Sequence, residues 1–275
     1  MMSGGSMIAL LAPLLTLALI GVEETPPPAP TPCPEGSAVE AAARRVLDGD
    51  VSVGRVRPVG IGGLCEIEVL LRGERRILYT DAAGTVAMLG PLVHLGTGRN
   101  LTREALEELN RFSPEDLAAL APAVAFTVGT GTTSFFYVVD PHCRYCKEGQ
   151  KAIEKLASEG LITARFVFLA LNDTSRRECA SILCDGKGYP EYLANYSVET
   201  PCEAGIKRLN DGVALLRSHG VTSTPTYIFP DGRLHSGWLD EGQLRQALGL
   251  PPAPTAPPRD AAAPTGTPAA AGGGK

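Results

Sequence analysis

The chain has 275 residues, a formal net charge of −5 at pH 7 and a hydrophobic fraction of 44%, values that fit one or two ordinary globular domains. Lysine and arginine do not gather into a basic tract, so there is no electrostatic reason to expect nucleic acid or an anionic membrane surface as a partner. Seven cysteines are many for a reducing cytosol and predict an oxidising compartment.

Both ends of the chain have compositions that do not build a core. Residues 7–22 are apolar over a length that suits a secretory signal peptide, although no Lys or Arg precedes them and no clear Ala-x-Ala cleavage site follows. We expect residues 1–22 to be a signal peptide that is cleaved, with an uncleaved N-terminal anchor as the alternative. Residues 23–36 indicate a Pro-rich linker, and residues 251–275, nearly all Pro, Ala and Gly, a disordered tail.

The first folded unit, residues 37–98, has the pattern of a small α+β domain. A short helix over 37–48, with Ser37 as its cap, precedes β-like runs separated by Gly-containing turns. These runs cover 51–59, 64–71, 75–80 and 85–89. One helix and four antiparallel strands bury little surface by themselves, so this domain is a candidate for dimerisation.

A helical linker over 99–123 leads to a second domain over 124–250. Thr102 is expected to cap the linker helix, and Ser113-Pro114 to interrupt it. The second domain alternates strands with helices and closes with a hairpin and a helix. Its expected elements are a strand at 134–139, a helix from 143, a strand at 162–169, helices at 174–184, 189–196 and 203–218, a hairpin over 227–238 and a helix at 240–248.

A Cys-x-x-Cys pair lies at the junction of the strand at 134–139 and the helix that follows it. Asp140-Pro141 ends the strand, and the apolar face of the helix begins near Cys143. Cys143 therefore lies in the first helical turn, where unpaired N–H groups and the helix dipole favour a thiolate. Cys146 lies within disulfide reach but is turned toward the protein. This arrangement predicts that Cys143 attacks and that Cys146 resolves the mixed disulfide.

Four neighbouring residues are candidates for tuning this pair. His142 and Arg144 flank the nucleophile and would add positive charge, and Tyr145 lies between the two cysteines. Asp140 would oppose that charge if it lies buried nearby, or it could accept the proton of Cys146.

Two other interpretations compete with a redox pair. A purely structural disulfide is disfavoured, because a two-residue spacer at a helix start strains the bond and exposes one sulfur. Half of a zinc site would need further ligands, but His94, His219 and His235 show no ligand-like spacing and no second Cys-x-x-Cys exists. We therefore expect a redox site that uses no metal and no organic cofactor.

The order of these elements and motifs resembles a known family. A βαβ unit followed by ββα around Cys-x-x-Cys is the thioredoxin-like plan. The motifs that resemble the catalytic domain of the DsbC/DsbG-type protein-disulfide isomerases of the bacterial periplasm are His142-Cys-Arg-Tyr-Cys146, the stretch 160–169, Cys184 and Cys202, Gly220-Val-Thr-Ser-Thr-Pro-Thr226 and Asp231-Gly232. Residues 77–84 and 89–91 are similar to that family's cystatin-like dimerisation domain, and residues 101–120 to its linker helix.

The resemblance implies a homodimer whose redox sites face an apolar cleft. The partners it implies are misfolded or unfolded exported proteins with disulfides and a membrane reductant of the DsbD type. It also implies that Thr224-Pro225 faces the cysteines with a cis peptide bond, so that the backbone of Thr224 pairs with an extended substrate strand. In isolation an ordinary trans-proline turn would be the alternative.

The resemblance further implies a structural disulfide between Cys184 and Cys202. Cys33 and Cys65 would then pair inside the first domain, which is a departure from the family, and Cys179 would be a buried thiol. A second departure is Arg144, because family members usually carry a small residue or proline there. A fixed cation at this position would make the disulfide more oxidising, whereas a solvated one would select acidic substrates, and the sequence leaves both open.

The sequence thus predicts a periplasmic thiol-disulfide oxidoreductase that reshuffles wrong disulfides through Cys143 and Cys146. Two alternatives remain. One is a dithiol oxidase of the same fold, and the other is a holdase chaperone whose apolar cleft does the work while the redox pair is secondary.

Overall fold

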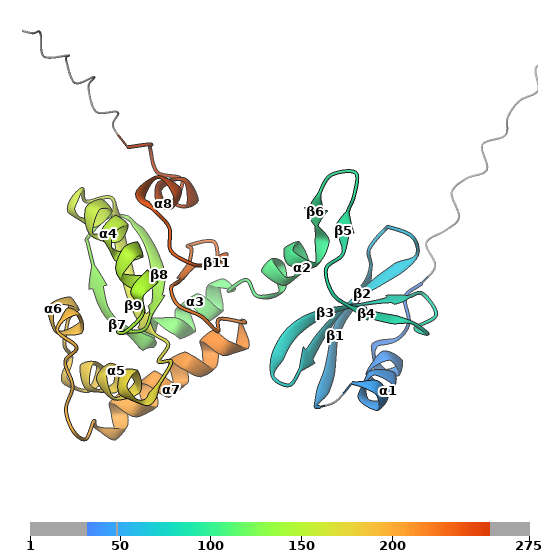
Figure 1. Ribbon diagram of the computed structural model, residues 1–275, viewed down its shortest axis with the longest axis horizontal. Helices are drawn as coiled ribbons and strands as arrows, with labels where there is room; N and C mark the ends of the chain where they lie inside the picture. Colours follow the sequence, from blue (N-terminus) through green and yellow to red (C-terminus); the bar gives the residue numbers. More distant parts are fainter. Residues whose placement is uncertain (1–31, 48, 254–275) are drawn as a thin grey trace, which may run out of the picture.

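The computed structural model describes residues 32–47 and 49–253, which form two domains joined by a helical connection (Figure 1). The expected signal segment over 1–22 lies outside the described residues, as does most of the Pro-rich linker and of the C-terminal tail. None of the helices in the described ranges has both the length and the apolar character needed to cross a bilayer.

The first domain is a four-stranded antiparallel sheet, and one helix precedes the sheet in the chain. The helix α1 spans Gly36–Val46, and the strands follow in the spatial order β1-β2-β3-β4. Their bounds are Val51–Pro58, Leu64–Leu71, Glu74–Asp81 and Ala87–Leu89. The predicted helix and all four predicted strands are confirmed within a few residues at their ends.

Each face of this sheet is covered by a different helix. Val39 of α1 packs against Ile67, Val69 and Leu78, whereas Ala105 of α2 packs on the opposite face against Ile77 and Tyr79. Neighbouring residues such as Ile77 and Leu78 serve opposite faces because side chains alternate along a strand. The resulting clusters are small, so this domain has a thin core.

Two of the expected helix caps are wrong. At α1 the cap residue is Glu35, whose carbonyl accepts from the N–H groups of Ala38 and Val39, so the helix begins before Ser37. At α2, which spans Leu101–Leu109, the side chain of Asn100 accepts from the N–H of Arg103.

Thr102 does not cap α2 because the preceding chain engages its hydroxyl. The hydroxyl accepts from the N–H of Leu92 at 2.7 Å and lies 3.1 Å from the carbonyl oxygen of Gly90. Between these residues and α2 the chain makes a short hairpin that the sequence did not predict, with β5 at Val93–His94 and β6 at Arg99–Asn100.

The linker helix is interrupted at Ser113-Pro114, as predicted from the proline. Helix α3 spans Pro114–Leu120 and is followed by the 3-10 turn η1 at Ala121–Ala123. Ser113 and Asp116 form a reciprocal capping box, and Pro114 occupies the first turn, where a missing N–H costs nothing.

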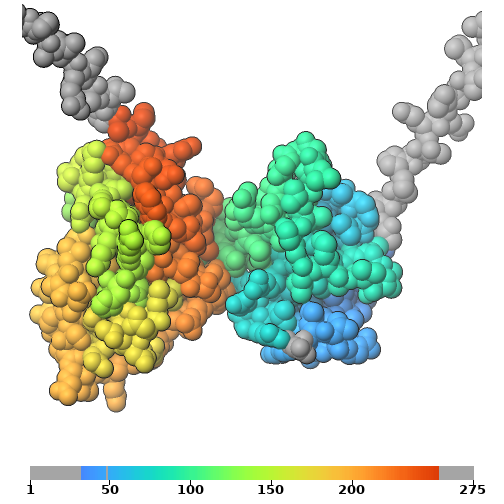
Figure 2. Space-filling view, viewed as in Figure 1, coloured from blue at the N-terminus to red at the C-terminus, as the bar shows by residue number. Residues whose placement is uncertain are grey.

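The linker is fastened to the second domain at this break. The N–H of Phe112 donates to the carbonyl of Gly232 at 2.9 Å, and the buried Phe112 ring stacks on His219 with a 4.0 Å centroid separation. The space-filling view shows the two domains touching at the centre of the molecule (Figure 2).

The second domain is built on a five-stranded sheet in the order β11-β10-β8-β9-β7, in which only β8 and β9 are parallel. The strands are β7 at Val124–Val128, β8 at Thr133–Val139, β9 at Ile162–Phe168, β10 at Thr226–Ile228 and β11 at Leu234–Ser236. The helices are α4 at Arg144–Ser158, α5 at Asp173–Asp185, α6 at Tyr189–Leu193, α7 at Glu203–Ser218 and α8 at Glu241–Ala247. This is the expected thioredoxin-like arrangement with inserted helices, to which β7 adds an edge strand that was not predicted.

The central strand β8 is buried on both faces, as its uninterrupted apolar composition predicted. Phe135, Tyr137 and Val139 belong to the same cluster as Ile153 and Leu156 of α4. Phe136 and Val138 instead share a cluster with Leu120 of α3 and Leu216 of α7. A strand packed on both sides holds its carboxyl end firmly, and the redox loop begins at that end.

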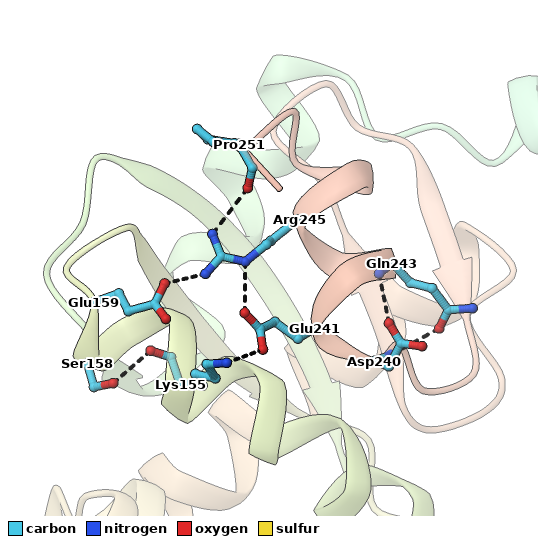
Figure 3. Close-up of polar contacts among 8 residues, drawn as sticks. All are labelled: Lys155, Ser158, Glu159, Asp240, Glu241, Gln243, Arg245 and Pro251. Carbon is cyan, nitrogen blue, oxygen red and sulfur yellow. Dashed lines mark hydrogen bonds and ion pairs between the residues drawn. The ribbon is translucent and has the colours of Figure 1, made fainter. Parts of the chain in front are cut away.

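Helix α4 is held at its far end by a nearly buried arginine of α8 (Figure 3). The Arg245 side chain, only 4% exposed, donates to Glu241 at 2.9 Å and also pairs with Glu159, the residue that ends α4. Lys155 of α4 completes the network through Glu241 at 2.5 Å. A buried guanidinium needs such paired carboxylates, so these contacts fix α8 against α4.

Candidate redox site

The Cys-x-x-Cys pair lies where β8 turns into α4. Cys143 is the N-cap residue of α4, and its sulfur accepts from the N–H of Cys146 at 3.0 Å. The two residues form a disulfide with a Cα separation of 5.2 Å. Cys146 is fully buried whereas Cys143 is partly exposed, so a reagent from solvent meets Cys143 first. Once the pair is reduced, the Cys143 sulfur faces the unpaired N–H groups that stabilise a thiolate.

Asp140 is buried beneath this loop and is bound by backbone groups. Its carboxylate accepts from the N–H of His142 at 2.8 Å and from the N–H of Leu171 at 2.9 Å, and the residue is 2% exposed. These bonds join the loop after β8 to the segment after β9. Asp140 is thus buried near the site, which is the condition for it to oppose the positive charge expected there, and its carboxylate makes no hydrogen bond to Cys146.

The two cations expected beside Cys143 differ in their surroundings. The His142 ring pairs with Glu178 of α5 at 2.9 Å, and the Glu178 side chain is 8% exposed. The side chain of Arg144 is exposed and makes no hydrogen bond or ion pair with any described residue. Tyr145 is also exposed, at 58%. His142 is therefore paired with a carboxylate, and Arg144 is the cation left in solvent next to the nucleophile.

Thr224 and Pro225 lie at the same edge of the sheet as the redox loop and are joined by a cis peptide bond. The register of β10 against β8 pairs Thr226 with Val138, which brings Thr224 level with Asp140. Pro225 is buried, and within the described part of the chain the buried hydroxyl of Thr224 has no hydrogen-bond partner. The structure thus brings the cysteines, Asp140 and the Thr224-Pro225 segment together.

Three contributors to the site were not found from the sequence. Glu178 lies 36 residues from His142, and no local pattern connects the two. The hydroxyl of Tyr137 donates to the carbonyl of Cys146 at 2.9 Å, and Leu171 supplies an N–H to Asp140. Tyr137 could have been suspected as the only residue with a polar tip in the buried strand 135–139, but the other two depend on tertiary packing.

The other five cysteines form two further disulfides and one free thiol. Cys184 and Cys202 form a disulfide between the end of α5 and the start of α7, and Cys33 and Cys65 form one that ties the segment before α1 to β2, each with a Cα separation of 5.7 Å. Cys179 is a free thiol that is fully buried. Burial raises the pKa of the Cys179 thiol well above its usual value, and the negative charges of Asp140 and Glu178 raise it further.

No group of three or more His, Cys, Asp and Glu side chains within residues 32–47 and 49–253 is arranged to hold a metal ion. What the site offers is sulfur chemistry. A partly exposed cysteine that caps a helix, with a buried partner three residues on, can exchange disulfides without any further group. On a thioredoxin-like sheet, these features define a thiol-disulfide oxidoreductase.

Comparisons with known proteins agree with this class. The family model described as a thioredoxin-like domain matches residues 122–250, and the one described as the disulfide bond isomerase protein N-terminal domain matches residues 30–103. A Bordetella avium protein described as a probable thiol:disulfide interchange protein DsbC is 32% identical over 204 residues, which cover 72% of this chain and 70% of the relative. The protein of the same description from Bordetella pertussis is 29% identical over 226 residues, covering 80% and 76%. The chain belongs to the DsbC family.

The similar solved structures are more distant in sequence than these relatives. The compact conformation of Proteus mirabilis ScsC gives a TM-score of 0.42 at 16% identity and covers 54% of this chain and 84% of that chain. A periplasmic thioredoxin-like protein from Salmonella enterica serovar Typhimurium gives 0.40 at 18% identity, covering 50% and 97%.

Proposed function

We propose that the protein isomerises wrong disulfides in exported proteins. The thiolate of Cys143 attacks one sulfur of the client disulfide, forms a mixed disulfide and releases the other client sulfur as a thiolate. The released thiolate then exchanges with another disulfide of the client, and the thiolate freed there attacks the client sulfur of the mixed disulfide, which forms a new client disulfide and returns Cys143 as a thiolate. No electrons are gained or lost over this cycle, so the client is reshuffled and the enzyme stays reduced.

The observation that carries the proposal is the division between the two sulfurs. Cys143 caps α4 and is open to solvent, whereas Cys146 is buried behind it. Cys146 can therefore act only after a mixed disulfide has formed, when its thiolate displaces the client as a dithiol and closes the Cys143–Cys146 disulfide. This escape oxidises the enzyme, so two electrons from a reductant are needed before the next cycle, and we assign that task to a DsbD-type membrane reductant in the periplasm.

We propose that Thr224 and Pro225 hold the client strand across the site. The support is their position level with Asp140 at the carboxyl end of β8. An extended client segment that lies along Thr224 would gain backbone hydrogen bonds in the manner of an added strand. His142, Arg144 and Tyr145 would then flank the client next to its disulfide.

A homodimer is part of the proposal, with the first domain as its interface. That domain exposes large apolar side chains close together in sequence: Val86, Met88, Leu89, Val93 and Leu95. Exposed apolar side chains gathered in one region mark interaction surfaces. Light scattering on the purified protein should give the mass of two chains, and Met88→Lys with Leu95→Lys should give that of one. Leu193→Lys on α6, where Leu193 is 51% exposed in the other domain, is the control and should leave the mass unchanged.

The decisive experiment is the refolding of scrambled ribonuclease by the reduced protein in a glutathione buffer. The client already has all its disulfides, so only reshuffling restores its activity. We expect recovery with the native protein and with a Cys184→Ala, Cys202→Ala variant assayed at low temperature, and none with Cys143→Ala. Equal recovery with Cys143→Ala would refute the assignment of the nucleophile.

One observation favours a dithiol oxidase as a second candidate. Arg144 follows Cys143 directly and no bound carboxylate offsets its charge, although its side chain is exposed and solvent screens part of the effect. A cation beside the thiolate stabilises the reduced enzyme and makes its disulfide a stronger oxidant. Failure with scrambled ribonuclease, combined with rapid oxidation of a fully reduced client that slows in Arg144→Gly, would establish this candidate instead.

A further inference from the structure

A groove of about 660 Å³ lies between the two domains. One wall is the turn between β2 and β3 together with the start of β3, and the other is formed by the segment after β9 and the loop after α7. Figure 1 shows the β2–β3 hairpin approaching the carboxyl end of α7, where the two elements are in contact. Because the linker is fastened to the second domain through Phe112 and Gly232, the two walls face each other in a defined way.

The charge of this groove is opposite to the charge of the whole chain. Its described lining contains the four arginines Arg72, Arg75, Arg76 and Arg217, and one carboxylate, Glu74. The chain as a whole carries −5. A local excess of cations in an acidic protein attracts anionic groups to that place and away from the rest of the surface.

The arginines also differ in how they are held. Arg75 donates to the carbonyl of Leu109 at 2.5 Å, a bond that orients the guanidinium and leaves its charge uncompensated. Arg76 pairs with Glu74, and both side chains are more than half exposed, so a competing carboxylate can displace that weak pair. The side chain of Arg217, in the last turn of α7, has no hydrogen bond or ion pair among the residues that the structure describes.

The groove reaches the redox site at two points. Leu171, which lines it, donates its N–H to the carboxylate of Asp140 under the Cys143 loop. Thr222, which also lines it, lies two residues before Thr224. A polypeptide held along Thr224 with its disulfide at Cys143 therefore continues into the arginine-lined space.

We propose that this groove binds acidic segments of the client polypeptide next to the disulfide that is being exchanged. The ligand is a stretch of peptide rich in Asp and Glu, whose carboxylates match the geometry of guanidinium groups. The inference rests on the proposed function for its purpose, because the groove gives the redox site a preference among disulfides according to their flanking charge.

Binding can be tested without any redox step. The probe is a fluorescent, cysteine-free peptide rich in glutamate, followed by fluorescence anisotropy on the full protein at low ionic strength. Matched peptides with glutamine or lysine in place of glutamate complete the set. The variant Arg76→Gln, Arg217→Gln should weaken binding of the glutamate peptide about fivefold, the effect of removing two exposed charges, and added salt should abolish the difference.

The control removes the same charge elsewhere. Arg45→Gln, Arg103→Gln takes away two exposed arginines that do not line the groove and should leave binding unchanged. Equal binding of the glutamate and glutamine peptides would overturn the proposal, and so would an equal loss in the control, because the attraction would then come from overall charge.

A kinetic arm separates this inference from the proposed function. The exchange rate is compared on disulfide-linked peptides that differ only in flanking glutamate or glutamine. We expect faster exchange beside glutamate, and loss of that preference in Arg76→Gln, Arg217→Gln. Reshuffling with no preference would overturn the role of the groove and leave the isomerase intact. Charge-dependent binding in a protein that reshuffles neither peptide would support the groove as a peptide site and overturn its role in isomerisation.

Discussion

The Cys143–Cys146 and Cys184–Cys202 pairs share the position at a helix start that predicted a reactive cysteine at residue 143. In both, one cysteine is the N-cap of a long helix and its sulfur accepts an N–H three residues on, at 3.0 Å for Cys143 and 3.3 Å for Cys202. Both capping cysteines are also reached by solvent. A cap position and partial exposure are therefore not enough to define a redox cysteine.

The two pairs differ in what surrounds the sulfurs. The first closes a span of three residues next to Asp140 and the Thr224-Pro225 segment, at an edge where a client strand can lie. The second closes a span of 18 residues, and its inner sulfur is pressed against the backbone of α7. A Cβ added to Gly205 would lie 2.4 Å from the sulfur of Cys184, so α7 closes that side of this sulfur. The approach to the sulfur, more than the helix dipole, separates the two.

The largest expected effect is the capture of a client by one pair and not by the other. Cys146→Ala leaves Cys143 without its resolving partner, so mixed disulfides with a reduced and reoxidising client should accumulate. Cys184→Ala likewise leaves a capping cysteine, Cys202, without its partner, but in a place without a client-binding edge. Electrophoresis without reductant should show covalent complexes for the first variant alone. Comparable complexes for both variants would show that the two pairs do not differ in their access to a client.

The second expected effect is on stability, and here the Cys184–Cys202 pair should show the larger change. Removing Cys184 and Cys202 together should lower the free energy of unfolding by about 3 kcal/mol, because the loop entropy of the unfolded chain is restored. Selective reduction of Cys143 and Cys146 should cost less, since their loop is short and the freed thiolate is stabilised at the helix start. Urea denaturation of the two forms measures both values. A larger loss on reduction of the redox pair would contradict this ranking.

The third effect concerns the charge under the redox loop. Asp140→Asn removes a buried negative charge close to the thiols, so the pKa of the Cys143 thiol should fall. An asparagine also has only one acceptor oxygen for the two N–H groups of His142 and Leu171, and the variant should be destabilised by about 1–3 kcal/mol.

The pH dependence of the iodoacetamide reaction of the reduced protein reports the thiol pKa directly. Asp173→Asn is the control, because Asp173 is exposed in the first turn of α5. An unchanged or raised thiol pKa in Asp140→Asn would show that the carboxylate does not act on Cys143.

Much of the fold was predictable because local patterns determine it. The apolar run of β8, the break at Ser113-Pro114 and the turns of the first domain each depend on residues that are close in sequence. Strand β7 was missed because it is a short, half-buried edge strand that follows the linker directly, although four of its five residues are apolar. Thr102 was taken as a cap because the sequence does not reveal that Gly90 and Leu92 approach its hydroxyl.

In the candidate site, too, some residues were predictable from local motifs and others depend on tertiary packing. Cys143, Cys146 and Thr224-Pro225 lie in short motifs, and the resemblance that these motifs carry implied that they lie together. The pairing of His142 with Glu178 joins two elements whose relative position follows from packing of the whole domain. The arginine groove could not be predicted from the sequence, because its charges come from both domains and lie close together only in the folded chain.

The smallest expected effect concerns Cys179, which is neither exchanging nor bridged. Its pKa is raised in the folded protein, so between the usual thiol pKa near 9.0 and the folded value the unfolded chain loses a proton that the folded protein keeps. Stability from this thiol is thus fully present below about pH 9 and declines as the pH rises further. Cys179→Ala should cost about 1 kcal/mol at pH 7 through lost packing, and this difference should shrink above pH 9. Thermal melts of both proteins from pH 7 to above 9 measure it, and tyrosines with raised pKa values, such as Tyr192, affect both proteins alike. A difference that stays constant with pH would mean that the thiol of Cys179 has the same pKa in the folded and unfolded chains, and the division between an inert buried thiol and the reactive one at the start of the preceding helix would be lost.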